Sequence, residues 1–140
     1  MATQAICTSF KVELFQGIHD ITDGGDTIKL ALFDSTVDLG PDTTAYSTTN
    51  EVTGTGYSAG GAALTVVDPT SVGYTAFVDF ADVTWSTSTI TARYGLIYNS
   101  SKADRAIAVL DFGSNRSSSA SDFTVRFPSA DALNAIVRIL

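Results

Sequence analysis

The pentapeptide Gly56-Tyr57-Ser58-Ala59-Gly60 matches G-x-S-x-G, the pattern that presents the nucleophilic serine of α/β-hydrolases. That chemistry needs a strand–turn–helix around the serine, followed along the chain by an acid and then a histidine. His19 is the single histidine of the sequence and precedes Ser58, and Gly60-Gly61 disfavours a helix at this point. We therefore interpret the pentapeptide as a glycine-rich turn and expect that the protein is not an enzyme.

Three carboxylates, Asp20, Asp23 and Asp26, surround a pair of glycines. Oxygen ligands of this kind suit Ca²⁺, but the spacing differs from that of an EF-hand loop and no bidentate glutamate follows. The same residues suit a turn in which Asp side chains accept backbone hydrogen bonds, and we favour this turn over a metal site. His19 and Cys7 have no second histidine or cysteine beside them, so we expect structural roles for both and no cofactor.

The charge distribution also limits the possible partners. Fifteen acids and eight bases give a net charge of −7, which disfavours nucleic acid because phosphate binding depends on Lys and Arg. Residues 1–70 carry nine acids and two bases, whereas residues 71–140 carry six of each. The acidic half could face a basic partner, or its dispersed aspartates could simply keep the protein soluble.

The remaining global signals concern the compartment. One cysteine excludes an internal disulfide. No apolar stretch reaches the roughly 18 residues of a membrane span, and the N-terminus lacks the basic start and apolar core of a signal peptide. We therefore expect no membrane partner, and synthesis and folding in a cytosol.

A length of 140 residues predicts one domain, 1–140. Its first element is a helix over about residues 4–16, ended by Gly17. The apolar stripe of this helix recurs at four-residue steps: Ile6, Phe10, Leu14 and Ile18, with Phe15 beside it. The stripe packs either on the following sheet or on a neighbouring subunit.

From about residue 27 to residue 140 the sequence predicts a β body. Short apolar or alternating runs, separated by polar turns, are typical of an antiparallel β-sandwich or barrel. The expected strands are 27–33, 62–67, 74–80, 90–98, 105–112, 123–127 and 134–140. Two loops are expected, a long one over 34–55 with a helical turn near Tyr46, and a Ser-rich one over 113–121. A loop as long as 34–55 is usually functional or mobile. The fold class is therefore mainly β, with one N-terminal helix.

Aromatic and arginine side chains are the candidates for binding. Trp85 is either a core residue or an interface anchor. Arg93, Arg126 and Arg138 can pair with acids of the same chain or of a neighbouring copy. The candidate interface residues are Ile6, Phe10, Phe15, Tyr46, Tyr57, Trp85, Arg93 and Arg116.

The stretch Asn50-Glu51-Val52-Thr53-Gly54-Thr55-Gly56-Tyr57, followed by Ala59-Gly60-Gly61, resembles the central motif of small virion proteins of tailed bacteriophages and prophages. The resemblance continues over residues 10–14, 17–20, 26–32, 90–93, 96–99 and 109–113. It extends over nearly the whole chain and implies a non-enzymatic structural component of the virion, made in the cytoplasm of the host bacterium.

Within that resemblance, a capsid decoration (cement) protein is the leading expectation. Such a protein binds the outside of the major capsid lattice and stabilises the head, as a symmetric homo-oligomer such as a trimer. The N-terminal helix and the segments 34–55 and 113–121 are the expected contacts with the major capsid protein or other virion proteins. The alternative is a tail, baseplate or fibre-associated protein that contacts the host surface through Tyr57, Tyr74 or Trp85.

Overall fold

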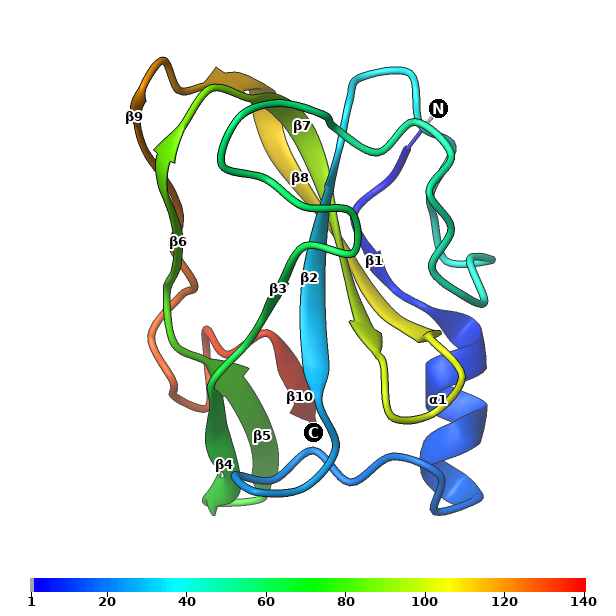
Figure 1. The fold of residues 1–140 in the computed structure, drawn as a ribbon. Helices are drawn as coiled ribbons and strands as arrows, with labels where there is room; N and C mark the ends of the chain where they lie inside the picture. The colour runs from blue at the N-terminus through cyan, green and yellow to red at the C-terminus, as the bar shows by residue number, and fades with distance from the viewer. Residues whose placement is uncertain (1) are drawn as a thin grey trace.

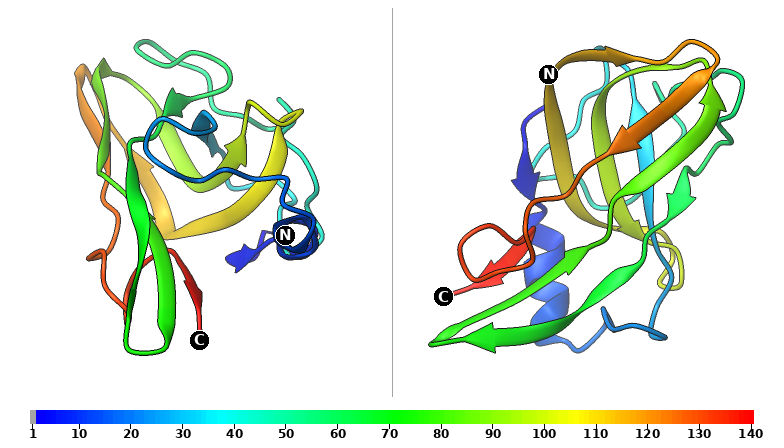
Figure 2. Two further views of the ribbon diagram at one scale, coloured as in Figure 1. Left: turned by 90° about the horizontal axis from the view of Figure 1, so that it is seen from below. Right: turned by 90° about the vertical axis from the view of Figure 1, so that its left-hand side faces the viewer.

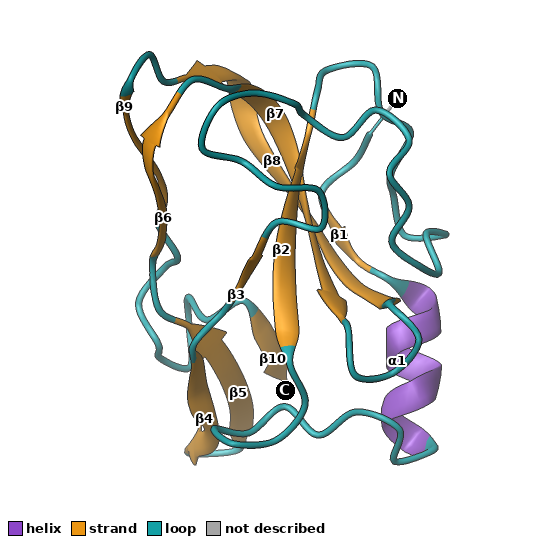
Figure 3. Ribbon diagram, viewed as in Figure 1, coloured by secondary structure: helices purple, strands orange, loops and turns teal. Residues whose placement is uncertain are grey.

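The computed structural model describes residues 2–140 and shows a mainly β protein with one short helix near its N-terminus (Figures 1 and 3). The elements in chain order are β1 (Ala5–Ile6), α1 (Thr8–Phe15), β2 (Ile28–Phe33), β3 (Ala62–Ala63), β4 (Val66–Val72), β5 (Thr75–Phe80), β6 (Val83–Ser88), β7 (Thr91–Asn99), β8 (Arg105–Ser117), β9 (Ser121–Val125) and β10 (Val137–Ile139). The paired strands in this part of the chain are antiparallel. These features confirm the predicted fold class.

Three sheets form two layers. The large sheet has the strand order β1-β8-β7-β2-β3. The smaller sheets, β10-β5-β4 and β6-β9, lie together on one side of it, and in the right-hand view of Figure 2 their strands cross in front of β8, β7 and β2. The body is therefore sandwich-like, and its hydrophobic core lies between the layers.

Strand β2 is buried on both faces, as its nearly uninterrupted apolar sequence predicts. Ile28 and residues 30–33 are each at most 1 % exposed. The two smaller sheets lie on one side of the large sheet (Figure 2). Helix α1 contacts β8 and lines a groove together with β5 and β10. The long segment 34–61 runs over the large sheet and reaches β6, where the Tyr57 ring lies 5.9 Å from that of Trp85.

Segment 34–61 is a packed cover for the sheet. The Tyr46 ring stacks on Tyr98 of β7 with 4.6 Å between centroids, and the Val52 amide donates to the Leu32 carbonyl at 3.0 Å. The expectation of a helical turn near Tyr46 is wrong, because Ala45 forms an isolated antiparallel bridge with Arg105. Pairing with a distant strand holds the backbone extended there.

The N-terminal helix is shorter than predicted. It spans Thr8–Phe15 rather than about 4–16. The reason is that Ile6 of β1 pairs with Ala108 of β8, and the Cys7 amide donates to the Ile107 carbonyl. Gly17, with φ +67°, ends the helix as expected. The four-residue periodicity therefore extended beyond the helix at both ends, since strand pairing takes the first residues of the pattern.

Three further strand expectations need correction. The predicted Ser-rich loop 113–121 is largely strand, because β8 continues to Ser117 and pairs with Thr91 of β7. Strand β4 does not end at Asp68-Pro69 but runs through it, with a register shift that accommodates the proline in this edge strand. The sequence also missed β6, which contains Trp85.

Candidate functional site

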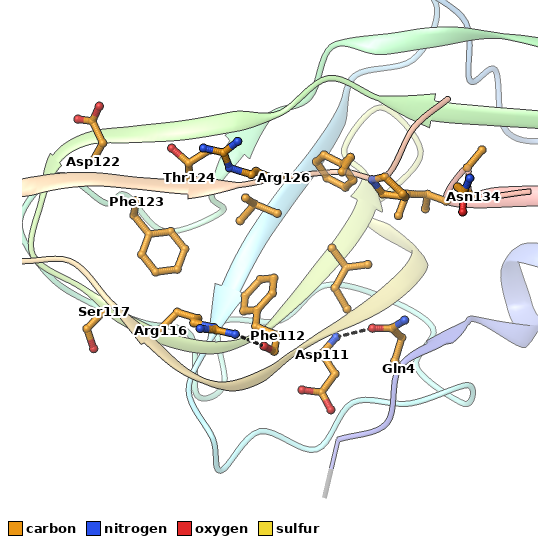
Figure 4. A pocket seen from close by; sticks show the side chains of 16 residues that line it. Gln4, Asp111, Phe112, Arg116, Ser117, Asp122, Phe123, Thr124, Arg126 and Asn134 are labelled. Carbon is orange, nitrogen blue, oxygen red and sulfur yellow. Dashed lines mark hydrogen bonds between the residues drawn. The ribbon is translucent and has the colours of Figure 1, made fainter. Parts of the chain in front are cut away.

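A groove of about 700 Å³ lies where the two layers separate along the edge formed by β8 and β9 (Figure 4). One wall comes from residues 110–112 and 116–117 of β8, and the other comes from β9 and its continuation to Pro128. Gln4, next to β1, and residues 134–136 close one end. The groove is thus built from segments that are distant in the sequence.

Polar and apolar side chains both line the groove, and part of its apolar surface comes from the alternation of side chains in β9. Phe123 and Val125 are buried, whereas Asp122, Thr124 and Arg126 are exposed. Such a period of two is the signature of a strand with one face inward. In Figure 4, Phe123 points across the groove toward Phe112 of β8.

Two exposed arginines, Arg116 and Arg126, lie at the polar rim of the groove. The Arg116 guanidinium lies 3.4 Å from its own strand's Phe112 carbonyl. Among residues 2–140, neither arginine forms an ion pair. Asp122 is the exposed acid on the same rim, and its carboxylate accepts from the Thr87 amide at 3.4 Å.

Asp111, the other acid of the groove, is already neutralised. Its carboxylate lies 3.0 Å from Arg93 Nε and accepts from the Gly113 amide at 2.8 Å. The Arg93 hydrogen bond, helped by that amide, holds the pKa of Asp111 below its ordinary value. The rim therefore presents two arginines against one unneutralised carboxylate, Asp122, and suits an anionic partner.

A second cluster of ionisable groups joins α1 to the β7–β8 turn. The fully buried His19 side chain lies 2.9 Å from Glu13 through Nε2 and 2.9 Å from Asn99 through Nδ1. An amide nitrogen can only donate, so Nδ1 accepts and Nε2 carries the proton. Asn99 also donates to Asp26 at 2.8 Å, and Arg105 donates to Glu13 at 2.6 Å.

This cluster is structural. Burial alone would raise the pKa of Glu13, but hydrogen bonds from His19 and Arg105 outweigh it and hold that pKa below its ordinary value. Both ring nitrogens of His19 already have partners, so the ring has no nitrogen left to activate a nucleophile. The expectation of a structural histidine agrees with these contacts.

The pentapeptide around Ser58 is a turn, as predicted. Gly56 and Gly60 both have positive φ, of 81° and 95°. The Tyr57 hydroxyl donates to Glu51 at 2.6 Å and accepts from the Leu32 amide at 2.9 Å. The second Glu51 oxygen accepts from the Tyr46 hydroxyl at 2.6 Å. Burial is the main cause that raises the pKa of both tyrosines, so they remain neutral donors.

The aspartate turn also matches its structural interpretation. The Asp26 carboxylate accepts from the Asp20 amide at 2.9 Å, and Asp20 accepts from the Thr22 hydroxyl at 2.7 Å. The Asp23 amide donates to Asp68 at 2.6 Å. Within residues 2–140, no group of three or more His, Cys, Asp or Glu residues is arranged to hold a metal ion.

The candidate interface residues fall into different environments. Phe10 and Trp85 are core residues, 1 % and 6 % exposed, which corrects their assignment to an interface. Three residues are half-buried and packed against the core: Ile6, Tyr46 and Tyr57. Arg93 is paired with Asp111, while Phe15 and Arg116 are exposed. Of the eight, only Arg116 lines the groove.

Sequence reasoning placed Arg126 on a polar strand face but did not find the groove. The alternation over 123–127 signals one buried face, yet nothing local shows that this face is opposed by Phe112 across an open edge. Only the arrangement of the two layers brings these side chains together.

Comparisons with known proteins returned no match: no protein-family model, no curated protein and no solved structure matches the chain. None of the helices in residues 2–140 has the length and apolar character needed to span a membrane.

Proposed function

We propose that the protein is a capsid decoration protein of a tailed bacteriophage, which binds the outside of the major capsid lattice through the groove between β8 and β9. The observation that carries this proposal is the groove itself, which combines apolar side chains such as Phe112 with an arginine rim. Such a surface suits tight binding to another protein. The sequence resemblance supplies the class of particle.

The internal bonding of the chemically versatile side chains favours binding over catalysis. His19 and Glu13 bond to each other, and Glu51 accepts from Tyr46, Tyr57 and the Gly60 amide. A catalytic site needs a nucleophile, base and acid that remain available to substrate. These groups instead hold the fold together.

A second surface suits contacts between copies of the protein. Phe15 is 95 % exposed at the end of α1, and Tyr74 is fully exposed at the turn between β4 and β5. Ile139 and Leu140 are exposed near the C-terminus, and all three places lie toward the lower end of Figure 1. Exposed aromatic side chains are enriched in interaction surfaces. We include a symmetric homo-oligomer, formed through this end, in the proposal.

The alternative of a glycan-binding tail protein has less support. It needs exposed aromatic rings that stack on sugars, but Trp85 is buried and the Tyr57 hydroxyl is bonded to Glu51 and Leu32. Of these three candidate rings, Tyr74 alone remains exposed. The lattice-binding proposal is therefore preferred.

The test uses phage heads that lack this protein. We expect the added protein to coat them, to appear by cryo-electron microscopy in many copies over the shell, and to raise their resistance to heat. Arg116→Glu should reduce coating, whereas Lys11→Glu, the same charge reversal at an exposed helix position, should not. Uncoated heads, or a few copies confined to the tail, would overturn the proposal.

A further inference from the structure

We propose that the groove binds an extended segment of its partner that alternates apolar and acidic residues, and that this segment adds to the free edge of β9 as a further strand. The inference rests on the proposed function for the kind of partner, a virion protein. The mode of binding comes from the edge, the groove and the charges described next.

Strand β9 has one paired edge and one free edge. It pairs with β6 through Val83–Val125, Thr84–Thr124 and Trp85–Phe123, and within residues 2–140 it has no other strand partner. In Figure 4, β9 forms one side of the groove. A free strand edge is a row of backbone donors and acceptors that can pair with another chain.

Two hydrogen bonds show which backbone groups lie on the free edge. The Phe127 amide donates to Asp82, which directly precedes β6, and the Ser121 carbonyl accepts from Ser88 at the end of β6. Odd-numbered residues of β9 therefore face β6. Because the backbone groups of successive residues point in opposite directions, those of Asp122, Thr124 and Arg126 face the groove side.

The groove accommodates the alternate side chains of an added strand. A strand that extends the β9 layer directs every second side chain toward the opposite layer. At this edge the opposite layer presents Leu110 and Phe112 of β8, both half-buried and both lining the groove. Apolar residues at alternate positions of the partner would cover these two half-buried side chains.

The other side chains of the added strand face the arginine rim. A residue directly opposite Arg126 lies within reach of its guanidinium, since opposed side chains on one face are direct neighbours. Arg116 extends the same positive potential from β8, and neither arginine has a carboxylate partner within residues 2–140. Carboxylates at these positions of the partner supply the missing counter-charges.

A peptide probe tests this directly. The probe is a blocked synthetic peptide, Val-Glu-Val-Thr-Val-Glu-Val, and its counterpart carries Lys in place of Glu. On binding of the Glu peptide, we expect amide hydrogen exchange of residues 122, 124 and 126 to slow by about tenfold or more, as new backbone bonds form. Unchanged exchange at all three amides would overturn strand addition.

Two matched pairs of variants separate the backbone contribution from the charge contribution. Thr124→Pro removes a donor from the free edge, whereas Thr124→Ala removes only the hydroxyl that contacts Thr84. We expect the proline variant to weaken binding by about tenfold relative to the alanine variant. The wild-type protein should bind the Glu peptide more tightly than the Lys peptide. Arg126→Glu should reverse this preference, while Lys11→Glu leaves it unchanged. If the proline variant does not fold, this second pair of variants tests the proposed binding mode.

Failure of this inference is distinguishable from failure of the proposed function. If wild-type protein coats heads and Thr124→Pro coats them equally, the binding mode is wrong while the function stands. If wild-type protein does not coat heads, the function is wrong, and the exchange of the β9 amides with the Glu peptide still decides whether the edge accepts a strand.

Discussion

At the scale of single residues, two glycines with similar backbone angles have very different surroundings. Gly17 and Gly61 have φ of +67° and +76°. A Cβ at Gly17 would meet no atom within 4 Å, whereas one at Gly61 would overlap the Leu30 carbonyl. Positive φ makes any other residue strained at both sites, but only Gly61 also needs the absence of a side chain.

Substitution of these glycines separates backbone strain from steric overlap. Gly17→Ala should lower the free energy of unfolding by about 1 kcal/mol, the usual cost of a left-handed non-glycine residue. Gly61→Ala should lower it by about 3 kcal/mol or more, since strand β2 must also move. Urea unfolding of both variants checks this. Equal losses of unfolding free energy would show that overlap with the Leu30 carbonyl does not destabilise the Gly61 variant.

Asp79 carries the one buried side-chain oxygen in residues 2–140 that lacks a hydrogen-bond partner. The residue is 1 % exposed, and its other oxygen accepts from the Phe80 amide at 2.8 Å. Burial raises the pKa of Asp79, and nearby Asp131 and Asp82 raise it further. The fold therefore favours the neutral carboxyl. The contribution of Asp79 to stability is greatest at pH values below the ordinary aspartate pKa. It is lost as the pH rises through the raised pKa that Asp79 has in the folded protein.

Asp79→Asn should consequently stabilise the protein in a pH-dependent way. At pH about 7 we expect the free energy of unfolding to increase by about 1 kcal/mol, because the buried charge is removed. Below the ordinary aspartate pKa the variant and the wild type should be equally stable. Denaturant unfolding at the two pH values tests this. Stabilisation by Asp79→Asn at the low pH only would contradict a raised pKa for Asp79.

At the scale of elements, the cover segment 34–61 is attached to the sheet by Glu51. This one carboxylate accepts from two tyrosine hydroxyls and from the Gly60 amide, all within 2.7 Å. Hydrogen bonds to a charged acceptor are the stronger kind, and loss of the acceptor leaves three half-buried donors unpaired. The segment thus depends on a residue that no local pattern marks as structural.

Removal of that carboxylate should loosen the cover without unfolding the body. Glu51→Ala is expected to lower the free energy of unfolding by about 2–3 kcal/mol and to speed amide exchange in residues 45–60. Thr49→Ala on the same segment loses only a hydroxyl contact with Ser47 and should change stability by less than about 0.5 kcal/mol. Equal effects of the two variants would contradict the role of Glu51.

At the scale of the whole molecule, ion pairs connect the acidic and the neutral halves of the chain. Arg105 binds Glu13 at 2.6 Å and Lys102 lies 3.6 Å from Asp26, so cations of the second half neutralise acids of the first. Arg93 pairs with Asp111 within its own half. The choice between pairing within one copy and pairing between copies was open for Arg93, Arg126 and Arg138, and it is decided for Arg93 alone. Arg126 and Arg138, like Arg116, form no ion pair within residues 2–140.

The apolar end of the molecule yields a prediction about assembly. If copies associate through Phe15 and Tyr74, the double variant Phe15→Ser/Tyr74→Ser should shift the protein to a monomer in light scattering. Its unfolding free energy per chain, measured at concentrations where the wild type is monomeric, should change by less than about 0.5 kcal/mol, because exposed side chains contribute little to the fold. If the double variant keeps the mass of the wild-type assembly, this end of the molecule is not part of the interface.

The sequence by itself determined the fold class and several turns. Alternation in strands such as 123–125, the apolar run 28–33 and the glycine at position 17 each act through neighbours in the chain, so their meaning survives without tertiary context. The order of His19 and Ser58, which differs from that of the hydrolase pattern, is likewise a property of the sequence alone. These features depend on local stereochemistry or on chain order alone.

Only the tertiary structure decided the helix start, the strand at 113–117 and the groove. Residues 5–7 leave the helical pattern because a distant strand offers them hydrogen bonds, and 113–117 become strand because β7 does the same. Phe112 faces Phe123, and Arg116 lines the same groove as Arg126, because two layers separate at one edge. Pairing, register and burial are long-range properties, and a sequence specifies them only through the whole fold.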